Sequence, residues 1–371
     1  MSLKGLSLLV GSPTPEPVTP DVLDALERVE IVTAIGERGS FRLTFRLDPG
    51  STLPARFLLE TGDLVRLVLI TTADGDPGVA MDGVMVQHTV STGVKGRARM
   101  LVIAGEDLTL LMDLIDASGR PFPGLPDAAR IQLILAGYAA VGVVPQVVPP
   151  PLVDVPVLAE RIFHQQGTDY AYVRSLATRV GHRFTLDPGP LPGASVAYWG
   201  PEPHADRSRP SLTVDFDRLA NVEELQLRFD AVHRVDPEAL VLDSASKIAI
   251  PIPVPDISNL VLPLGAVVPP AQRRRRLHQT AKLTPLQAVG ALLAEAARSA
   301  EAMTGLGTLH LRRRGRRLRA GGLVEVRAAS APFDGLFAIS RVHDTITART
   351  HRQEFELVRA GIGAAAPWST S

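Results

Sequence analysis

Two runs of arginine are the residues whose type and spacing most directly suggest chemistry. They are Arg273, Arg274, Arg275 and Arg276, and then Arg312, Arg313, Arg314, Arg316 and Arg317. Guanidinium groups bind phosphates and carboxylates, so these runs could contact a nucleic acid or an acidic protein surface. Aromatic residues that would stack on bases are not interleaved with them. We interpret the runs as solvated surface, or as assembly or lumen-facing residues that meet an acidic partner.

The chain as a whole is neutral, with 39 basic and 39 acidic residues, although residues 271–327 hold thirteen Lys and Arg against three Glu. A neutral chain gives no general reason to expect a specific nucleic acid or an anionic membrane as its partner. The longest apolar run, Ile131–Val144, is too short to cross a bilayer. We therefore expect no membrane insertion.

Carboxylates and histidines offer little further chemistry. Asp107, Asp113 and Asp116 fall along one predicted helix, which favours a solvated face over paired-carboxylate catalysis. His343 and His351 are eight residues apart across a predicted hairpin turn, which favours strand ends over a metal site. With no cysteine, disulfides and thiolate chemistry are excluded. The sequence predicts no catalytic residue, no cofactor and no metal.

The elements that must carry these residues are mainly strands. With 371 residues the chain has room for two or three domains, and 31 glycines and 31 prolines suit short strands and turns better than a helical bundle. Val29–Ile35 and Ser40–Leu47 read as two strands with a hairpin loop between them. Glu106–Ala117 reads as a helix.

One group of three strands occurs twice. Segment Gly321–Gly361 contains alternating strands at Leu323–Arg327, Gly335–Val342 and Gln353–Arg359. Segment Gly62–Gly105 has the same parts in the same order, at Gly62–Leu67, Asp82–His88 and Arg99–Gly105. In each copy a Gly precedes the first strand, an Asp-Gly pair opens the second, and the third closes on Gly. The sequence thus predicts a duplicated β unit.

The middle of the chain predicts a helix from the Thr168-Asp169 cap to Val180, with Gly181 at its end. Its aromatic residues Tyr170 and Tyr172, like Trp199, read as core. Thr284-Pro285 opens a second well-marked helix, and Gly305-Leu306-Gly307 ends it. We expect a mainly β (α+β) fold with two small tube-protein-like antiparallel β-barrels and an inserted α/β domain. The predicted parts are a flexible N-terminal arm (1–20), a first barrel with a helix (21–120), the inserted domain (121–215), a second barrel (216–361) with an irregular excursion (243–280) and a helix (284–303), and a disordered tail (362–371).

Two sets of residues carry a family resemblance. The first is Gln165-Gln166-x-x-Asp169-Tyr170-x-Tyr172-Val173-x-x-Leu176-Ala177 followed by Gly181-x-x-Phe184. The second comprises Thr284-Pro285-x-Gln287-Ala288, Gly307-Thr308-Leu309, Gly315-Arg316-x-Leu318-x-Ala320-Gly321, Phe333-Asp334-Gly335-Leu336-Phe337 and Glu354-Phe355-x-Leu357-Val358-Arg359-Ala360-Gly361. The first resembles phage late control protein D and the N-terminal part of VgrG-type spikes, and the second resembles hub proteins of contractile injection systems.

The resemblance implies a structural protein of a baseplate, and not an enzyme. It implies a homotrimer that joins a hexameric inner tube protein above to a separate trimeric spike protein below, surrounded by other baseplate proteins. Such a hub is assembled in the bacterial cytoplasm as part of a phage tail or tail-like particle. Two equivalent units in each of three chains would present six similar positions to a six-fold tube.

Two other functions stay open from the sequence. One is a phage-tail-associated cell-wall hydrolase with Asp107 or Glu295 as acid or base, which no acid/base motif supports. The other is a nucleic-acid-binding module that uses the arginine runs.

Overall fold

The computed structural model describes the greater part of the chain. The described ranges are 5–12, 14–57, 64–72, 78–91, 99–153, 162–189, 191–201, 210–213, 222–242, 248–252, 264–278, 280, 283–311, 316–327 and 329–364. Predicted features that fall in the gaps, among them Arg312–Arg314 and Gly62, lie outside the described residues.

The fold is mainly β, as the sequence predicts, and its largest element is one sheet of 13 strands in which neighbours are almost all antiparallel. The main path runs β14-β19-β22-β21-β3-β4-β7-β6-β5-β1-β2, and β13 and β20 pair off this path. The strands are β1 (Leu6–Gly11), β2 (Glu16–Pro17), β3 (Leu26–Ala34), β4 (Ser40–Leu47), β5 (Arg66–Thr71), β6 (Gly78–Ser91), β7 (Arg99–Asp107), β13 (Ser211–Thr213), β14 (Val222–Phe229), β19 (Met303–His310), β20 (Leu323–Arg327), β21 (Gly335–Thr347) and β22 (His351–Arg359).

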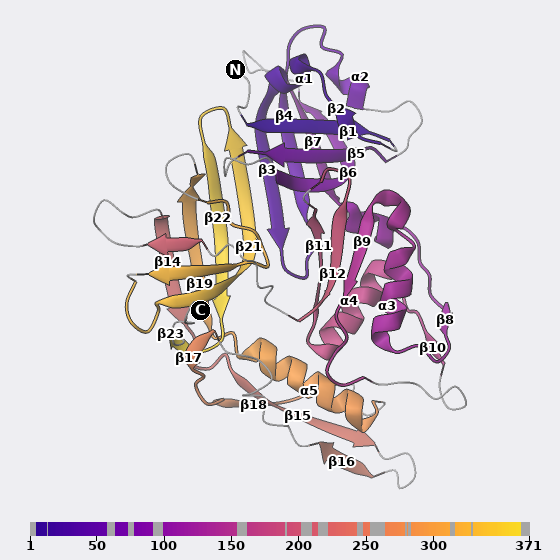
Figure 1. The fold of residues 1–371 in the computed structure, drawn as a ribbon, viewed down its shortest axis with the longest axis vertical. Helices are drawn as coiled ribbons and strands as arrows, with labels where there is room; N and C mark the ends of the chain where they lie inside the picture. The colour runs from indigo at the N-terminus through magenta and orange to yellow at the C-terminus, as the bar shows by residue number, and fades with distance from the viewer. Residues whose placement is uncertain are drawn as a thin grey trace, which may run out of the picture.

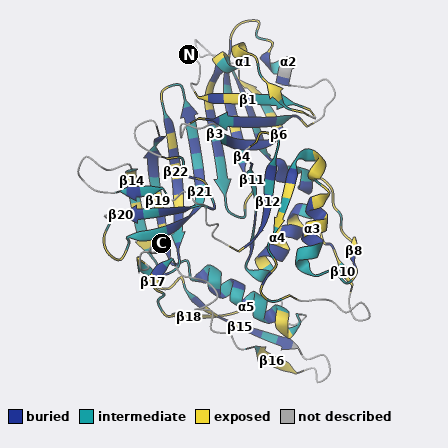
Figure 2. Ribbon diagram, in the orientation of Figure 1, coloured by how far each residue is buried: buried dark blue, intermediate teal, exposed yellow. Residues whose placement is uncertain are grey.

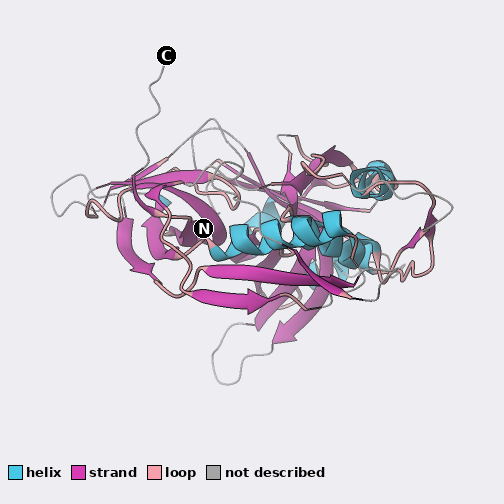
Figure 3. Ribbon diagram, turned by 90° about the horizontal axis from the view of Figure 1, so that it is seen from below, coloured by secondary structure: helices cyan, strands magenta, loops and turns pink. Residues whose placement is uncertain are grey.

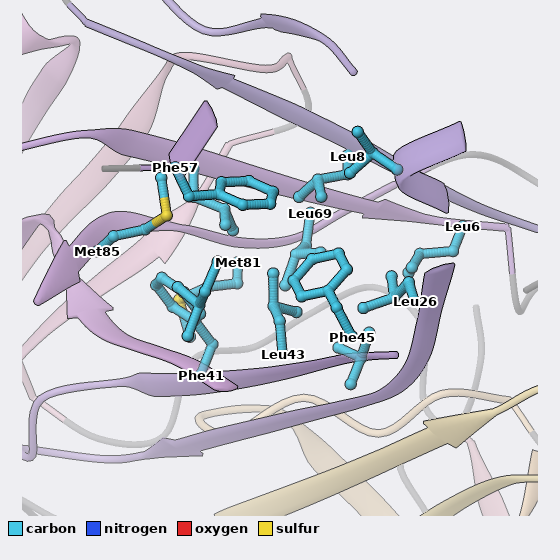
Figure 4. Close-up of a cluster of buried hydrophobic side chains, with 14 of the residues drawn as sticks. Leu6, Leu8, Leu26, Phe41, Leu43, Phe45, Phe57, Leu69, Met81 and Met85 are labelled. Carbon is cyan, nitrogen blue, oxygen red and sulfur yellow. The ribbon is translucent and has the colours of Figure 1, made fainter. Parts of the chain in front are cut away.

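The first β unit, defined as β3 to β7, has its own hydrophobic core. Residues alternate along β4, so Phe41, Leu43 and Phe45 are buried and the residues between them face the other side. Side chains from β1, from the short helices α1 (Pro20–Ala25) and α2 (Leu53–Phe57), and from β5 and β6 complete the cluster (Figure 4).

The second β unit, defined as β14 and β19 to β22, repeats the first. Its strands are joined in the same order: β3-β4-β7-β6-β5 in the first unit corresponds to β14-β19-β22-β21-β20 in the second. The two units lie edge to edge, because β3 of the first pairs with β21 of the second (Figure 1). A separate core fills the second unit, with Phe337, Ile339 and Phe355 at its centre.

Two pairs of β-bulges, at matching positions in the two units, confirm the duplication at residue level. The β3–β4 ladder shifts register between Leu26 and Arg28, and the β14–β19 ladder shifts between Val222 and Glu224. A second pair of bulges interrupts β6 at Met85/Gln87 and β21 at Ile339/Arg341. A bulge adds one residue at a defined place, so matched bulges fix which residues correspond.

The predicted correspondence of the two Asp-Gly pairs is wrong. Asp82 and Gly83 lie inside β6, whereas Asp334 and Gly335 open β21. The bulges and the ladders to the third strand also match Gly105 with Leu357, so the glycines that close the two segments are not equivalent either. The repeat is carried by strand order and burial rather than by these residue types.

A smaller α/β region follows the first unit and packs beside it (Figure 1). Its sheet pairs β11 (Arg183–Pro188), β12 (Ser195–Gly200) and β9 (Val143–Val147), and its main helices are α3 (Asp127–Ala136) and α4 (Asp169–Val180). The predicted caps of α4 are confirmed: the Thr168 side chain accepts from the Ala171 N–H, and Gly181 has a left-handed backbone with φ of 75°. Two short strands, β8 (Pro121–Phe122) and β10 (Phe163–His164), pair beside them.

The excursion of the second unit is more regular than predicted. Strands β16 (Ala249–Ile252), β15 (Val235–Leu242) and β18 (Arg273–Arg276) form a small sheet covered by α5 (Pro285–Ser299). Figure 3, seen from below, shows α5 lying across the strands. Helix α5 begins after Thr284, as predicted, and Gln287 completes a capping box with it. Strand β17 (Gly265–Val267) pairs with β23 (Ile362–Ala364).

Several predicted ends are wrong. The flexible arm includes β1, whose Leu6 and Leu8 are buried against the first unit, and the disordered tail includes β23. The helix at Glu106–Ala117 is a short 3-10 helix, η1 (Leu108–Asp113), because β7 continues to Asp107. A second 3-10 turn, η2 (Ala139–Val141), precedes β9.

Candidate assembly surface

The junction between the two β units is a continuous antiparallel ladder. Strand β21 pairs with β3 from Arg341↔Ala34 to Thr347↔Arg28. On the core side of this ladder Val29, Ile31 and Val342 are almost completely buried. The junction therefore closes the outer edge of β3 and the second half of β21 together.

The equivalent edges at the two ends of the sheet are open among the described residues. The second half of β6 pairs with β7 on one side, while β5 covers only its first half, up to Val84. Among the described strands, β14 pairs with β19 alone. Val86 and Val90 on β6 are 52% and 51% exposed, and Leu225 and Leu227 on β14 are half-buried. Figure 2 shows this mixed exposure along β14, at the left margin of the molecule.

The sheet face opposite the two cores is polar and hollowed. Two hollows of about 370 Å³ each lie on it, one over each β unit, and both are lined by His343 and Val32 at the junction. Acidic and basic side chains mix on this face. They include Glu30, Arg42, Glu106, Glu224, Arg341, Glu354 and Glu356. Five glutamates against two arginines make the lining of the two hollows acidic on balance.

A buried ionic cluster supports the junction strand from within. Asp344 of β21 is 1% exposed; its Oδ2 accepts from Arg317 at 3.0 Å and its Oδ1 lies 2.8 Å from the His351 Nε2. Burial by itself would raise the pKa of Asp344, but Arg317 and His351 hold that pKa below its usual range. The carboxylate is therefore charged and paired.

Arginines of the first unit fasten the α/β region to it. Arg38, in the β3–β4 loop, binds Glu106 at 2.6 Å and Asp113 at 2.7 Å, and its guanidinium lies over the Tyr170 ring. Arg66 of β5 binds both oxygens of buried Asp82, which also accepts from the Ser195 hydroxyl of β12. Asp113 is thus paired rather than a free carboxylate.

Asp107 lines a cavity of about 610 Å³ where the two β units meet the α/β region. Burial raises the pKa of Asp107 to about 6, although hydrogen bonds from Thr109 and Gly39 oppose the shift. Its Oδ2 accepts from the Gly39 N–H and its Oδ1 from the Thr109 N–H and hydroxyl. Both oxygens are therefore engaged in holding the β3–β4 loop and the start of η1.

Glu295, the other predicted acid or base, lies on α5 and does not line that cavity. Its carboxylate binds Arg275 and Arg298, each at 2.8 Å. Burial would raise the pKa of Glu295, but the two arginines lower it overall. The two carboxylates are not brought together.

The structure separates the predicted arginine residues. Arg273, Arg274, Arg275 and Arg276 form β18 and are exposed, and Arg316 is exposed, whereas Arg317 lies in the buried cluster with Asp344. Arg312, Arg313 and Arg314 lie outside the described residues. The assembly or lumen-facing role of the exposed arginines stays a prediction.

Other predicted features are accounted for by packing. Trp199 and Tyr172 are buried in the core of the α/β region. His343 lies on the polar face, with its Nδ1 3.6 Å from Glu354, while His351 is inside the second unit. No group of three potential metal ligands occurs among the described residues, and none of the helices described is long and apolar enough to cross a membrane.

Sequence reasoning missed the residues of the open edges. The prediction for the second strand of the first unit stopped at His88, whereas β6 continues to Ser91. The available signal was Val84, Val86 and Val90, an apolar alternation that His88 interrupts. Its function as an edge becomes visible only when the strand order is known.

No protein-family model matches the chain, and no curated protein sequence matches it. Solved structures do. A tail protein from Neisseria meningitidis is 17% identical with a TM-score of 0.61, and a prophage 43 kDa tail protein from Shewanella oneidensis is 15% identical with a TM-score of 0.62. Each match covers 96% of this chain and 99% of the other.

An Escherichia coli component of the type VI secretion system is also similar, at 12% identity and a TM-score of 0.55 over 92% of this chain and 76% of that one. That protein has structural similarity to tail proteins of bacteriophage T4. At these identities the likeness concerns the fold. The chain has the fold of phage tail proteins and of a secretion-system component related to them.

Proposed function

We propose that the protein is the structural hub of a phage-tail or injection-system baseplate. In this role it is a homotrimer that joins a hexameric inner tube on one side to a trimeric spike on the other. Other baseplate proteins surround it. The tail-protein fold supports a structural part in such a particle, and the finer role rests on the geometry of the two β units.

The observation that carries the proposal is the duplication with open ends. Each chain supplies two equivalent units side by side, and a ring of three chains would present six similar units around its axis. A six-fold tube ring could then contact every unit in the same way, although the spike below has only three chains. Long open edges are an aggregation hazard in a monomer, and lateral closure covers them.

The polar face of the sheet fits the wall of a lumen. If the edges close laterally, one sheet face must point to the axis and the other must hold the cores. The face that carries Glu30, Arg42 and Glu354 has no hydrophobic core on it, so we assign it to the lumen. The middle α/β region and α5 then lie outside or below the ring.

The mass of the assembled protein tests the proposal. Native mass spectrometry of the purified full chain should give a trimer, and particles averaged by electron microscopy should be rings with three-fold symmetry and six similar lobes. Mixed with the inner tube protein of the same particle, the trimer should bind the end of the tube. A monomer or dimer at micromolar concentration that also fails to bind tube ends would contradict it.

Peptidoglycan hydrolysis can be checked in the same preparation. Asp107 and Glu295 are held in separate structural contacts, so a zymogram on peptidoglycan should show no cleared band. A cleared band lost in an Asp107→Asn variant would favour the hydrolase instead.

A further inference from the structure

The β3–β21 junction is an internal copy of an interface whose other copy has no partner among the described residues. It joins β21 of the second unit to β3, the first strand of the first unit. The counterparts of these strands are β6 and β14, and in the described part of the chain both are open at the corresponding edges. We propose that the second half of β6 in one chain pairs with β14 of a second copy of this chain, in the register of the β3–β21 junction.

This inference rests on the proposed function for its trimer and goes further, because it names the strands and the residue pairs. The matched bulges give the correspondence without any choice of alignment. Gln87 follows the bulge in β6 as Arg341 follows the bulge in β21, and Glu224 follows the bulge in β14 as Arg28 follows the bulge in β3.

The junction register then transfers directly. In the junction His343 lies opposite Val32, and Asp344 lies opposite Ile31. Thr89 and Val90 correspond to His343 and Asp344 of β21. The same register therefore places Thr89 opposite Arg228 of the second copy, and Val90 opposite its Leu227. The first pair lies on the polar face, and the second pair lies on the face of the cores.

Burial at the two interfaces supports a missing strand at the open one. Val29 and Ile31 of β3 are 0% and 1% exposed, in the core of the first unit and on the strand that pairs with β21. Their counterparts on β14, Leu225 and Leu227, are only half-buried. Val90, which would cover Leu227, is 51% exposed. Pairing of the two edges would bury these apolar side chains and would form backbone hydrogen bonds of a ladder. Both effects favour the contact.

The contact is head-to-tail, so it must close to a ring or continue as a filament. Each chain offers one β6 edge and one β14 edge. If the angle across β6–β14 equals the angle across β3–β21, successive units are related by equal rotations. An even number of units closes the ring, and three chains supply the six units of the proposed hub.

The absence of cysteine allows a direct test by disulfide crosslinking. We would combine Thr89→Cys with Arg228→Cys in the full chain, because both residues are exposed and neither substitution enters a core. Opposite residues of an antiparallel ladder have Cα atoms about 4.5–5.5 Å apart, within the range of a disulfide. After mild oxidation, a denaturing gel without reductant should show covalently linked chains up to a closed trimer.

The matched control is Thr89→Cys with Gln226→Cys. Gln226 lies on the same strand and the same face, but it is two residues out of register, so its Cα would be about 7–8 Å away and would crosslink poorly. We expect at least about fivefold more crosslinked protein from the Arg228 pair than from the Gln226 pair. Equal crosslinking, or more from the Gln226 pair, overturns the register.

Native mass of each variant before oxidation separates this inference from the proposed function. A trimer without crosslinks means that the trimer exists but uses other edges, which overturns the inference alone. A monomer without crosslinks overturns both. Crosslinked trimers that do not bind inner tube protein support the inference and contradict the hub.

A second variant tests the same contact without a disulfide. Leu227→Asp places a charge at the proposed contact while its side chain is only half-buried in the single chain. It should reduce the trimer at least tenfold with the circular dichroism spectrum unchanged. An undiminished trimer would overturn the β14 contact.

Discussion

The two β units share their strand order and two matched bulges, but they handle buried charge in opposite ways. The third strand ends at Asp107 in the first unit and at Arg359 in the second, and the ladders make these two residues counterparts. Asp107 accepts hydrogen bonds from the backbone N–H groups of Gly39, in the β3–β4 loop, and of Thr109, at the start of η1. Arg359 is 1% exposed and donates to the carbonyls of Pro332 and Asp334, while burial lowers its pKa to about 10. The strand framework therefore tolerates either sign, provided that the local loop supplies the complementary groups.

The second strands differ where one is covered and the other is not. Asp344 on β21 is buried under β3 and is paired with Arg317 and His351, whereas its counterpart on β6 is exposed Val90. The covered strand can hold a charge because its partners are in the same chain. The uncovered strand carries an apolar residue, which suits a contact that forms only when a second chain arrives.

The largest effect should come from breaking the buried cluster of the second unit. Asp344→Asn removes the buried negative charge that pairs with Arg317 and His351, and we expect a loss of about 3–5 kcal/mol in the free energy of unfolding. Urea unfolding of the full chain, followed by circular dichroism, measures it. The matched change in the first unit, Val90→Asn, should cost less than about 0.5 kcal/mol in the monomer, because the side chain is exposed. Equal losses of unfolding free energy in the two variants would mean that the buried ionic cluster does not stabilise the second unit.

A change of pH should act on the first unit through Asp107. The pKa of this acid is raised to about 6 in the folded protein, so the folded state binds a proton more tightly than the unfolded state. The contribution of Asp107 to stability is therefore greatest below pH 4 and falls as the pH rises through 6, by about 3 kcal/mol in total. Asp107→Asn should lack this fall, so the difference in unfolding free energy between the variant and the parent should change by that amount between pH 4 and pH 7. A constant difference would contradict the raised pKa.

The smallest losses of stability should come from removing the N-terminal caps of helices α4 and α5. Thr284→Ala removes the capping box of α5 and should cost about 1 kcal/mol. Thr168→Ala removes the cap of α4 and also the hydrogen bond from the Thr168 hydroxyl to Asp113, which Arg38 holds. We expect about 2 kcal/mol for this change, because the cap and a bond to a charged group are lost together. Thermal unfolding of both variants gives the comparison, and a larger loss for Thr284→Ala would contradict it.

Much of the fold follows from local sequence signals. The alternation in Ser40–Leu47 predicted β4 with its observed bounds, and the Thr-Pro start predicted α5. Thr168 and Gly181 predicted both ends of α4. These signals are short-range, because a strand face or a helix cap is set by residues within a few positions of one another.

Other features could not be predicted from the local sequence, because the contacts that decide them are between residues far apart in the chain. Gly305 and Gly307 were interpreted as the end of a helix, but they lie in β19, where the Phe355 ring of β22 occupies the space that a Cβ of Gly307 would need. Leu6 and Leu8 were assigned to a flexible arm because prolines follow them, yet β5 supplies the edge on which they form β1. In neither case does the neighbouring sequence contain the partner.

The sequence by itself determined that the chain repeats a three-stranded unit, that it has no cysteine chemistry, that α4 lies between Thr168 and Gly181, and that α5 begins after Thr284. Only the tertiary structure decided which residues correspond, that the two units share one sheet through β3 and β21, and that the edges of β6 and β14 are open. Strand pairing is chosen by surfaces that are distant in sequence, and periodicity reports only which face of a strand is apolar. An open edge is defined by the strand that is missing beside it, and no local pattern records that.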